Sequence, residues 1–208
     1  MHKRMKFILA TKSSMTQFFA EDGKVSPATI LEVTPSTVTR IKTVETDGYT
    51  AVQVGYGVQD ERRVSKSVKG ALKDLGTFKV LKEFRLQDAE IANFTIGSKI
   101  SADTFTGGDI VTISGVSKGK GFQGVVKRHG FVGGWGGHGQ KHSMREPGSI
   151  GATGPQRVLK GTRMAGRMGG DRITVKGLTV LAVDATNNRI LVKGAVPGKR
   201  GTLLEIKG

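Results

Sequence analysis

The chain has 208 residues, with 33 lysines and arginines against 17 aspartates and glutamates, and a formal net charge of +16. This length suits one or two domains with a real hydrophobic core, and the charge favours a polyanionic partner, of which nucleic acid is the leading candidate. The chain contains no cysteine, which excludes disulfide bonds and cysteine-ligated zinc.

The opening segment, MHKRMKFILATKSSMTQFF, places basic residues before a short apolar run. The run MKFILA is too short for the apolar core of a signal peptide, and no stretch of about 18 apolar residues occurs in the sequence. We therefore expect this segment to form a strand of a soluble protein that has no membrane partner.

Alternation of apolar and polar residues, with many β-branched side chains, predicts five strands before residue 117. They cover residues 5–10, 28–33, 38–44, 49–54 and 109–114. Between the last two, the apolar residues Val64, Val68, Ala71, Leu72 and Leu75 share one face of a helix that Gly76 could end. We expect this helix to pack on the sheet of a mainly β domain.

The stretch from 117 to 170 has a different composition. It contains ten lysines and arginines against Glu146 alone, and 16 of the 31 glycines of the chain. With almost no apolar periodicity between Gly133 and Gly154, it cannot bury enough surface to fold by itself. A long loop of this kind is expected to be functional or ordered by a partner, and a basic extension threaded into nucleic acid meets both conditions.

A glycine motif opens this stretch, because Gly119-Lys-Gly121-Phe-Gln-Gly124 fits the G-x-G-x-x-G pattern of dinucleotide sites and of kinases. It leads into VVKRHGFVGGWGG, which we expect not to form the helix that a dinucleotide site needs. No H-R-D or D-F-G motif follows, and the remaining chain is too short for a kinase lobe. Three interpretations stay open: a turn between strands, a loop that contacts RNA phosphates, and a nucleotide-dependent enzyme.

The same stretch contains two histidines and a tryptophan that bear on its chemistry. His138 and His142 are four residues apart, but GGHGQKH is a poor helix former without a third ligand, which favours contacts with phosphate, 2′-hydroxyl or base edges over a metal site. Trp135, the only tryptophan, is flanked by glycines, which favours stacking on an unpaired base or sugar over burial in a core. No G-x-S-x-G elbow or paired acidic motif indicates a hydrolytic centre.

The predicted site is therefore a surface for a nucleic-acid strand, in which glycines admit the phosphate backbone and cations neutralise it. No catalytic residue, metal ligand or cofactor is predicted. The predicted RNA-binding residues, for which the resemblance described below implies rRNA, are Lys118, Lys120, Gly121, Lys127, Arg128, His129, Trp135, His138, Lys141, His142, Arg145, Arg157, Lys160, Arg163 and Arg167.

After residue 170 the β pattern resumes in the segments RITVKGLTVLAVD, ILVKGAVPG and LLEIKG. Asn187 and Asn188 between the first two tolerate left-handed backbone conformations, which predicts a hairpin.

Two parts of the sequence resemble the bacterial form of the universal large-subunit ribosomal protein L3 family. One contains KGKGFQGVVKRHGF, HGQKHSMREPGSIGATGPQRVLKGTRMAGRMGG and the strands that follow. The other, MTQFFAEDGKVSPATILEV, is similar to the M-T-Q-x-F-x-x-D-G opening of that family. Serines replace the glycines that are usual before this opening. Ala152 and Thr153 follow G-S-I-G, so we do not expect the methylated glutamine that some members carry there.

The resemblance implies a translation-protein-type β-barrel over residues 1–116 and 171–208, a small α/β insertion over 60–95, and an rRNA-penetrating extension over 117–170. It implies a structural, non-enzymatic constituent of the large ribosomal subunit that binds rRNA near its 3′ end, nucleates assembly, and sends the extension towards the peptidyl transferase centre. The implied partners are 23S-type rRNA and neighbouring large-subunit proteins in the cytoplasm, without a membrane or small-molecule substrate. A free-standing RNA chaperone is the alternative.

Overall fold

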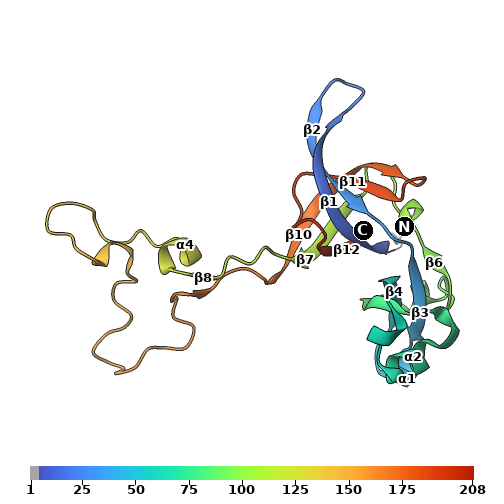
Figure 1. Ribbon diagram of the computed structural model, residues 1–208, viewed down its shortest axis with the longest axis horizontal. Helices are drawn as coiled ribbons and strands as arrows, with labels where there is room; N and C mark the ends of the chain where they lie inside the picture. Colours follow the sequence, from blue (N-terminus) through green and yellow to red (C-terminus); the bar gives the residue numbers. More distant parts are fainter. Residues whose placement is uncertain (1–4) are drawn as a thin grey trace. The chain divides into compact units, whose positions relative to one another are not determined.

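The computed structural model describes residues 5–208 of the chain (Figure 1). These residues divide into two compact units. The first unit comprises the chain up to Val116 together with Arg172–Gly208, and the second unit is Ser117–Asp171. The basic residues that open the sequence before Met5 lie outside the described residues.

Six antiparallel strands of the first unit close into a barrel in the order β1-β12-β7-β10-β11-β2. The ring closes where β1 pairs with β12, with Phe7 opposite Lys207 and Thr11 opposite Leu203. The strands are β1 Phe7–Phe19, β2 Val25–Glu32, β7 Ile110–Val116, β10 Arg172–Asp184, β11 Arg189–Lys193 and β12 Leu203–Lys207.

The hydrophobic core follows from the two-residue period of these strands. In β7, β11 and β12 every second residue is buried, as Leu204 and Ile206 are in β12. In β1, by contrast, the four consecutive residues Phe7–Ala10 are all buried, because both faces of this strand are covered. The ring of Phe7 stacks on Phe84 with the ring centroids 4.3 Å apart, which joins the barrel core to the neighbouring sheet.

This neighbouring sheet has four strands in the order β5-β4-β3-β6. Its strands are β3 Ser36–Lys42, β4 Ala51–Val58, β5 Phe78–Arg85 and β6 Lys99–Ile100. The short helices around it are α1 Val44–Asp47, η1 Glu61–Arg63, α2 Lys66–Leu72, η2 Lys73–Leu75, α3 Asp88–Ile91 and η3 Ala102–Thr104. The region 60–95, expected to be a small insertion, thus contains the strand β5 as well as helices.

The predicted mainly β class is confirmed. The predicted hairpin is present as β10–β11, where Asn188 has a φ of 51° and Asp184 accepts hydrogen bonds from Asn187. Two local predictions were wrong. Val44 ends no strand but begins α1 and is exposed, and Ala71 of α2 is exposed although helical spacing placed it on the buried face.

The second unit contains little regular structure. Its elements are β8 Phe122–Gln123, α4 Val125–His129, η4 Ser143–Arg145 and β9 Gly166–Arg167. The prediction that no helix follows the glycine motif was wrong, because α4 begins directly after Gly124 and ends at Gly130, whose φ is 72°. No helix within residues 5–208 is long and apolar enough to cross a membrane.

Candidate nucleic-acid interface

Paired backbone segments hold the two ends of the second unit together, and we call them the neck (Ser117–Gln123 and Gly166–Asp171). The N–H groups of Ser117 and Lys120 donate to the carbonyls of Asp171 and Met168, each at 2.9 Å, and the Met168 N–H returns a bond of 2.9 Å to Gly121. Beyond these bonds β8 pairs with β9. The neck brings positions about 50 residues apart into contact without a hydrophobic core.

Gly169 permits the close approach of the two segments of the neck. Its φ is 75°, and a Cβ atom there would lie 2.1 Å from the carbonyl oxygen of Lys118. A side chain is therefore excluded both by the backbone conformation and by the opposite segment. This glycine lies outside the G-x-G-x-x-G motif, whose Gly119 and Gly124 have open space around them.

The helix α4 is anchored by its own basic residues. Arg128 Nη1 donates to the carbonyl oxygen of Met164 at 2.7 Å, and His129 Nε2 lies 3.0 Å from the same oxygen. Both side chains are partly buried, and the adjacent Val125 is the one fully buried residue that the structure describes between 117 and 171. Arg128 and His129, predicted as rRNA contacts, thus hold the segment around Met164 against α4.

The loop from Gly133 to Met144, which we call the tryptophan loop, is closed by backbone and amide hydrogen bonds. The Gly134 N–H donates to the Met144 carbonyl at 2.9 Å. The Gln140 amide links the Trp135 carbonyl, to which it donates at 3.2 Å, with the Met144 N–H, from which it accepts at 2.8 Å. Although the loop is closed, the Trp135 side chain itself is 95% exposed. The indole is therefore free to contact a partner.

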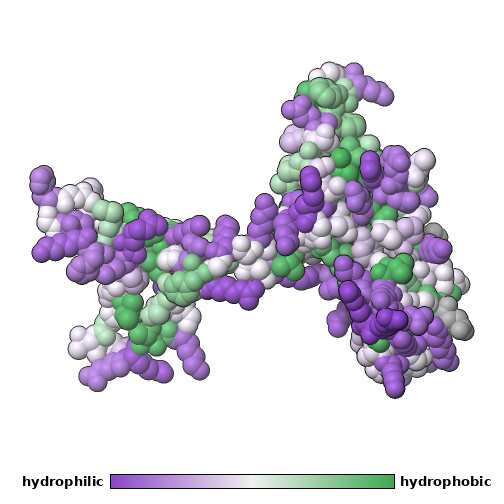
Figure 2. Space-filling model, viewed as in Figure 1, coloured by the Kyte–Doolittle hydropathy of each residue, from purple (hydrophilic) through white to green (hydrophobic). Residues whose placement is uncertain are grey.

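The cations of this unit are exposed apart from Arg128, and none of them has a carboxylate partner among the described residues. Within residues 5–208, every ion pair belongs to the first unit, so none of the ten cations between 117 and 171 has a carboxylate partner. All predicted site residues except Arg128 and His129 are exposed, and Figure 2 shows hydrophilic side chains along this unit, interspersed with pale and hydrophobic ones. A field of unpaired positive charge is suited to a polyanion.

His138 and His142 both lie in the tryptophan loop and are exposed. Over residues 5–208 no group of three or more histidines and carboxylates is arranged to hold a metal ion. The glycine motif also differs from a dinucleotide loop, since the Lys120 N–H is bonded to Met168 and α4 has only five residues. Neither the histidine pair nor the glycine motif therefore forms a site for a metal ion or a dinucleotide among the described residues.

Several exposed apolar side chains near these cations were not predicted as part of the site, and Phe122 and Val132 are the most exposed of them. Phe122 is 75% exposed within the neck, and Val132 is 98% exposed next to the tryptophan loop. Their sequence context could have indicated this exposure. An apolar residue in a stretch of glycine and basic residues has few apolar neighbours with which to form a core. Phe122 and Val132 extend the candidate surface beyond its charged groups.

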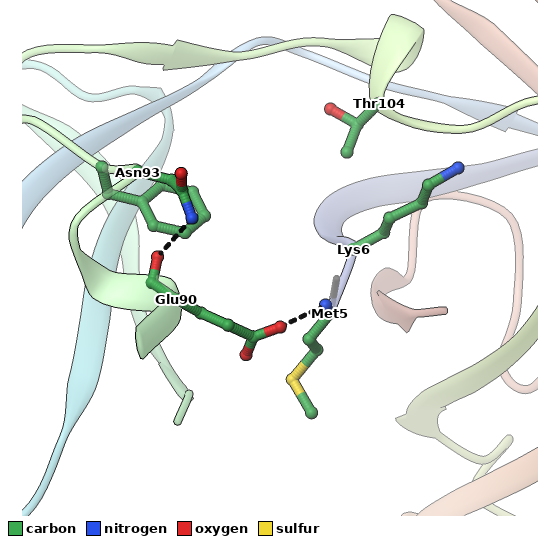
Figure 3. Close-up of a pocket in the computed structure, with 6 residues that line it drawn as sticks. Met5, Lys6, Glu90, Asn93 and Thr104 are labelled. Atoms are coloured by element: carbon green, nitrogen blue, oxygen red, sulfur yellow. Dashed lines mark hydrogen bonds between the residues drawn. The ribbon is translucent and has the colours of Figure 1, made fainter. Parts of the chain in front are cut away.

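The first unit contains a cavity near the start of its described chain (Figure 3). It is lined by Met5, Lys6, Glu90, Asn93, Phe94 and Thr104. Glu90 accepts a hydrogen bond from the Met5 N–H at 2.7 Å, Asn93 donates to the Glu90 carbonyl at 3.2 Å, and Lys6 pairs with Asp109 at 2.6 Å. Its polar groups are thus bonded within the chain and do not converge on a ligand.

A mainly β protein with an exposed, glycine-rich and unpaired basic segment has the properties of a structural RNA-binding protein. The family model described as Ribosomal protein L3 matches residues 75–189. The chain therefore belongs to the ribosomal protein L3 family, whose members are structural proteins of the ribosome and not enzymes.

Bacterial relatives align along nearly the whole chain. A protein of Thermobifida fusca named "Large ribosomal subunit protein uL3" is 48% identical over 99% of this chain and 95% of its own length. Proteins of the same name from Acidothermus cellulolyticus and Desulfitobacterium hafniense are 47% and 48% identical, over 100% and 97% of this chain and 94% and 95% of their own lengths. The resemblance noted in the sequence is thus confirmed.

Proposed function

We propose that this protein is a structural constituent of the large ribosomal subunit that binds 23S-type rRNA near its 3′ end and nucleates assembly of the subunit. The relatives carry a name that assigns them to the large subunit. The first unit would be a translation-protein-type barrel that docks on the subunit. The second unit would be the extension, directed towards the peptidyl transferase centre, in a ribosome of the cytoplasm.

One observation carries this proposal: the ten cations between 117 and 171 have no carboxylate partner in a segment with one buried side chain. Unpaired charges at this density repel one another, so the free segment gains from neutralisation by phosphates. Exposed cations such as Lys141, Arg145 and Lys160 would contact phosphates, whereas Trp135 would stack on an unpaired base.

The residues of the predicted site would divide their roles. Arg128 and His129 would shape the extension through the Met164 carbonyl rather than contact rRNA directly. Gly121 would serve the neck, where its carbonyl accepts the Met168 N–H. The remaining exposed residues would form the rRNA surface, whose sequence selectivity would come from RNA shape and stacking rather than from a base code.

Sedimentation tests the proposal. The tagged full-length protein is expected in large subunits after a high-salt wash. A variant with Lys141, Arg145, Arg157, Lys160 and Arg163 replaced by glutamine is expected to be depleted from them, whereas exchanging lysine and arginine at the same five positions keeps the charge and should preserve incorporation. Recovery of the wild-type protein only among free proteins would contradict the ribosomal role and favour the free-standing RNA chaperone.

A further inference from the structure

The first unit carries a projecting two-stranded hairpin that the rRNA surface does not include. We call residues 13–27 the β1–β2 arm (Figure 1). Pairing of β1 with β12 ends at Thr11, and pairing of β2 with β11 begins at Ala28. Among the described residues, the backbone of the arm therefore bonds only within the β1–β2 hairpin up to Ser26, and at its base the Pro27 carbonyl accepts a hydrogen bond from the Gly194 N–H at 2.8 Å. An isolated pair of strands is marginally stable in water, so the arm gains from a partner.

The register of the arm places its exposed apolar residues on one face. Phe19 lies opposite Val25 and Gln17 lies opposite Pro27, and directly opposed residues share a face. Met15, two residues before Gln17, belongs to the same face because side chains alternate along a strand. Met15, Phe19 and Val25 are 53%, 68% and 52% exposed, and Pro27 is exposed as well. We call these four residues the apolar stripe.

The charge of the arm differs from that of the rest of the chain. Residues 13–27 contain Glu21 and Asp22 against Lys24 alone, in a chain whose net charge is +16. Lys24 Nζ also lies 2.8 Å from Asp22 Oδ2, so the one cation of the arm is neutralised within the turn. Phosphates would meet an acidic turn and no free cation here, which disfavours RNA as the partner of the stripe.

We propose that the apolar stripe is a docking surface for another protein of the large subunit, one whose apolar patch is bordered by lysine or arginine. The patch would cover Phe19 and Val25, and its basic border would meet Glu21, the carboxylate of the turn that Lys24 does not pair with. Four side chains cover less than the roughly 800 Å² per partner of a stable interface, so the contact belongs to the assembled particle rather than to a binary complex. This inference rests on the proposed function.

Site-specific crosslinking within assembled subunits tests it. A photoreactive phenylalanine analogue is placed at position 19 on the stripe, or at position 16 as the control. Thr16 is also exposed, but it pairs with Ala28 on the opposite face of the arm. After irradiation of salt-washed large subunits, we expect position 19 to crosslink to a protein, at a site that combines apolar residues with lysine or arginine, and position 16 to give no such product.

Charge variants at Glu21 test whether the partner's apolar patch has a basic border or whether the contact is apolar alone. With the analogue at position 19, Glu21→Lys should lower the crosslink yield and Glu21→Gln should lower it less. A crosslink from position 19 to RNA, an equal yield from position 16, or no protein product from subunits that contain the chain would each overturn the docking surface alone. Absence of the chain from large subunits would overturn the proposed function together with it.

Discussion

The fluorescence of Trp135 can report RNA binding at a single residue. It is the only tryptophan and is 95% exposed, so all indole fluorescence of the free protein comes from a solvated side chain. If the indole stacks on a base, rRNA fragments should quench this emission. Trp135→Ala should weaken binding by about 1–3 kcal/mol, and Trp135→Phe should weaken it less because a ring remains. Unchanged emission on binding would exclude the stacking role.

Gly169 controls the neck through steric exclusion. Gly169→Ala would place a Cβ atom 2.1 Å from the Lys118 carbonyl oxygen at a φ of 75°. The left-handed conformation alone costs an alanine about 1–2 kcal/mol. We expect amide hydrogen exchange at Lys120 and Met168, which are bonded across the neck, to accelerate about five- to thirtyfold.

The control for this substitution is Gly119→Ala in the same segment, where a Cβ atom would meet nothing within 4 Å. Exchange at Lys120 and Met168 should then stay near the wild-type rate. In both variants the amides of β12 in the first unit should keep their protection. Equal exchange rates in the two variants would show that the neck tolerates a side chain at position 169.

Among the secondary-structure elements, Glu205 links a barrel strand to the neighbouring four-stranded sheet through an ion pair. Its carboxylate, on β12, forms an ion pair with Lys82 of β5, with 3.1 Å between Lys82 Nζ and Glu205 Oε1, and a second ion pair with Arg172 of β10. Burial raises the pKa of Glu205, but the hydrogen bonds from Lys82 and Arg172 outweigh it, and the resulting pKa lies below the ordinary value of 4.5. The carboxylate therefore stabilises the fold above pH 4.5, and this contribution is lost as pH falls through the lowered pKa.

Glu205→Gln tests this linkage by chemical denaturation followed by far-ultraviolet circular dichroism. At pH 7 the variant should lose about 1–2 kcal/mol of the free energy of unfolding, since two hydrogen bonds to a charged group are weakened and both partners are partly exposed. The difference from wild type should shrink as pH falls below 4.5. Glu61→Gln is the control, because its pair with Lys69 is 3.8 Å long and exposed. A pH-independent difference would contradict the assignment.

Elements with a strong local pattern could be predicted from the sequence. The segment RITVKGLTVLAVD coincides with β10, because alternation and β-branched residues continue throughout it. The strand β5 was not predicted, because its apolar residues Phe78, Val80, Leu81 and Phe84 do not alternate strictly with polar ones. The helix α4 was also missed, because its short VVKRH segment is held by contacts with Met164, about 35 residues away.

The candidate site shows the same limit. Composition predicted the basic segment, and the exposure of its cations agrees with that prediction. Composition could not separate Arg128 and His129 from the other basic residues, because their partner is a backbone carbonyl that only the folded chain brings near. The role of Gly169 was equally hidden, since the opposing Lys118 carbonyl lies about 50 residues earlier.

The charge of the whole molecule predicts a strong dependence of RNA binding on salt. Six to ten phosphate contacts would reduce affinity by about 10³–10⁵ between 50 and 200 mM salt, on the scale known for duplexes. Replacing Lys141, Arg145, Arg157, Lys160 and Arg163 by glutamine should lower the slope of log affinity against log salt by about 0.7–0.9 per lost contact. Titration of an rRNA fragment measures this slope, which lysine–arginine exchange should leave unchanged. A flat salt response of the wild-type protein would contradict electrostatic binding.

Closure of the barrel by β12 has a consequence for the nascent chain. β12 lies between β1 and β7, although β1 is the first strand to be synthesised and β12 the last. Until Leu203–Lys207 has been translated, β1 and β7 keep open edges of the kind that recruit other strands. Residues 117–171 precede that moment, so a growing chain carries its complete basic segment before the barrel can close. A chain stalled before residue 203 would expose unpaired strand edges that are prone to aggregate, yet its basic segment could already attract RNA.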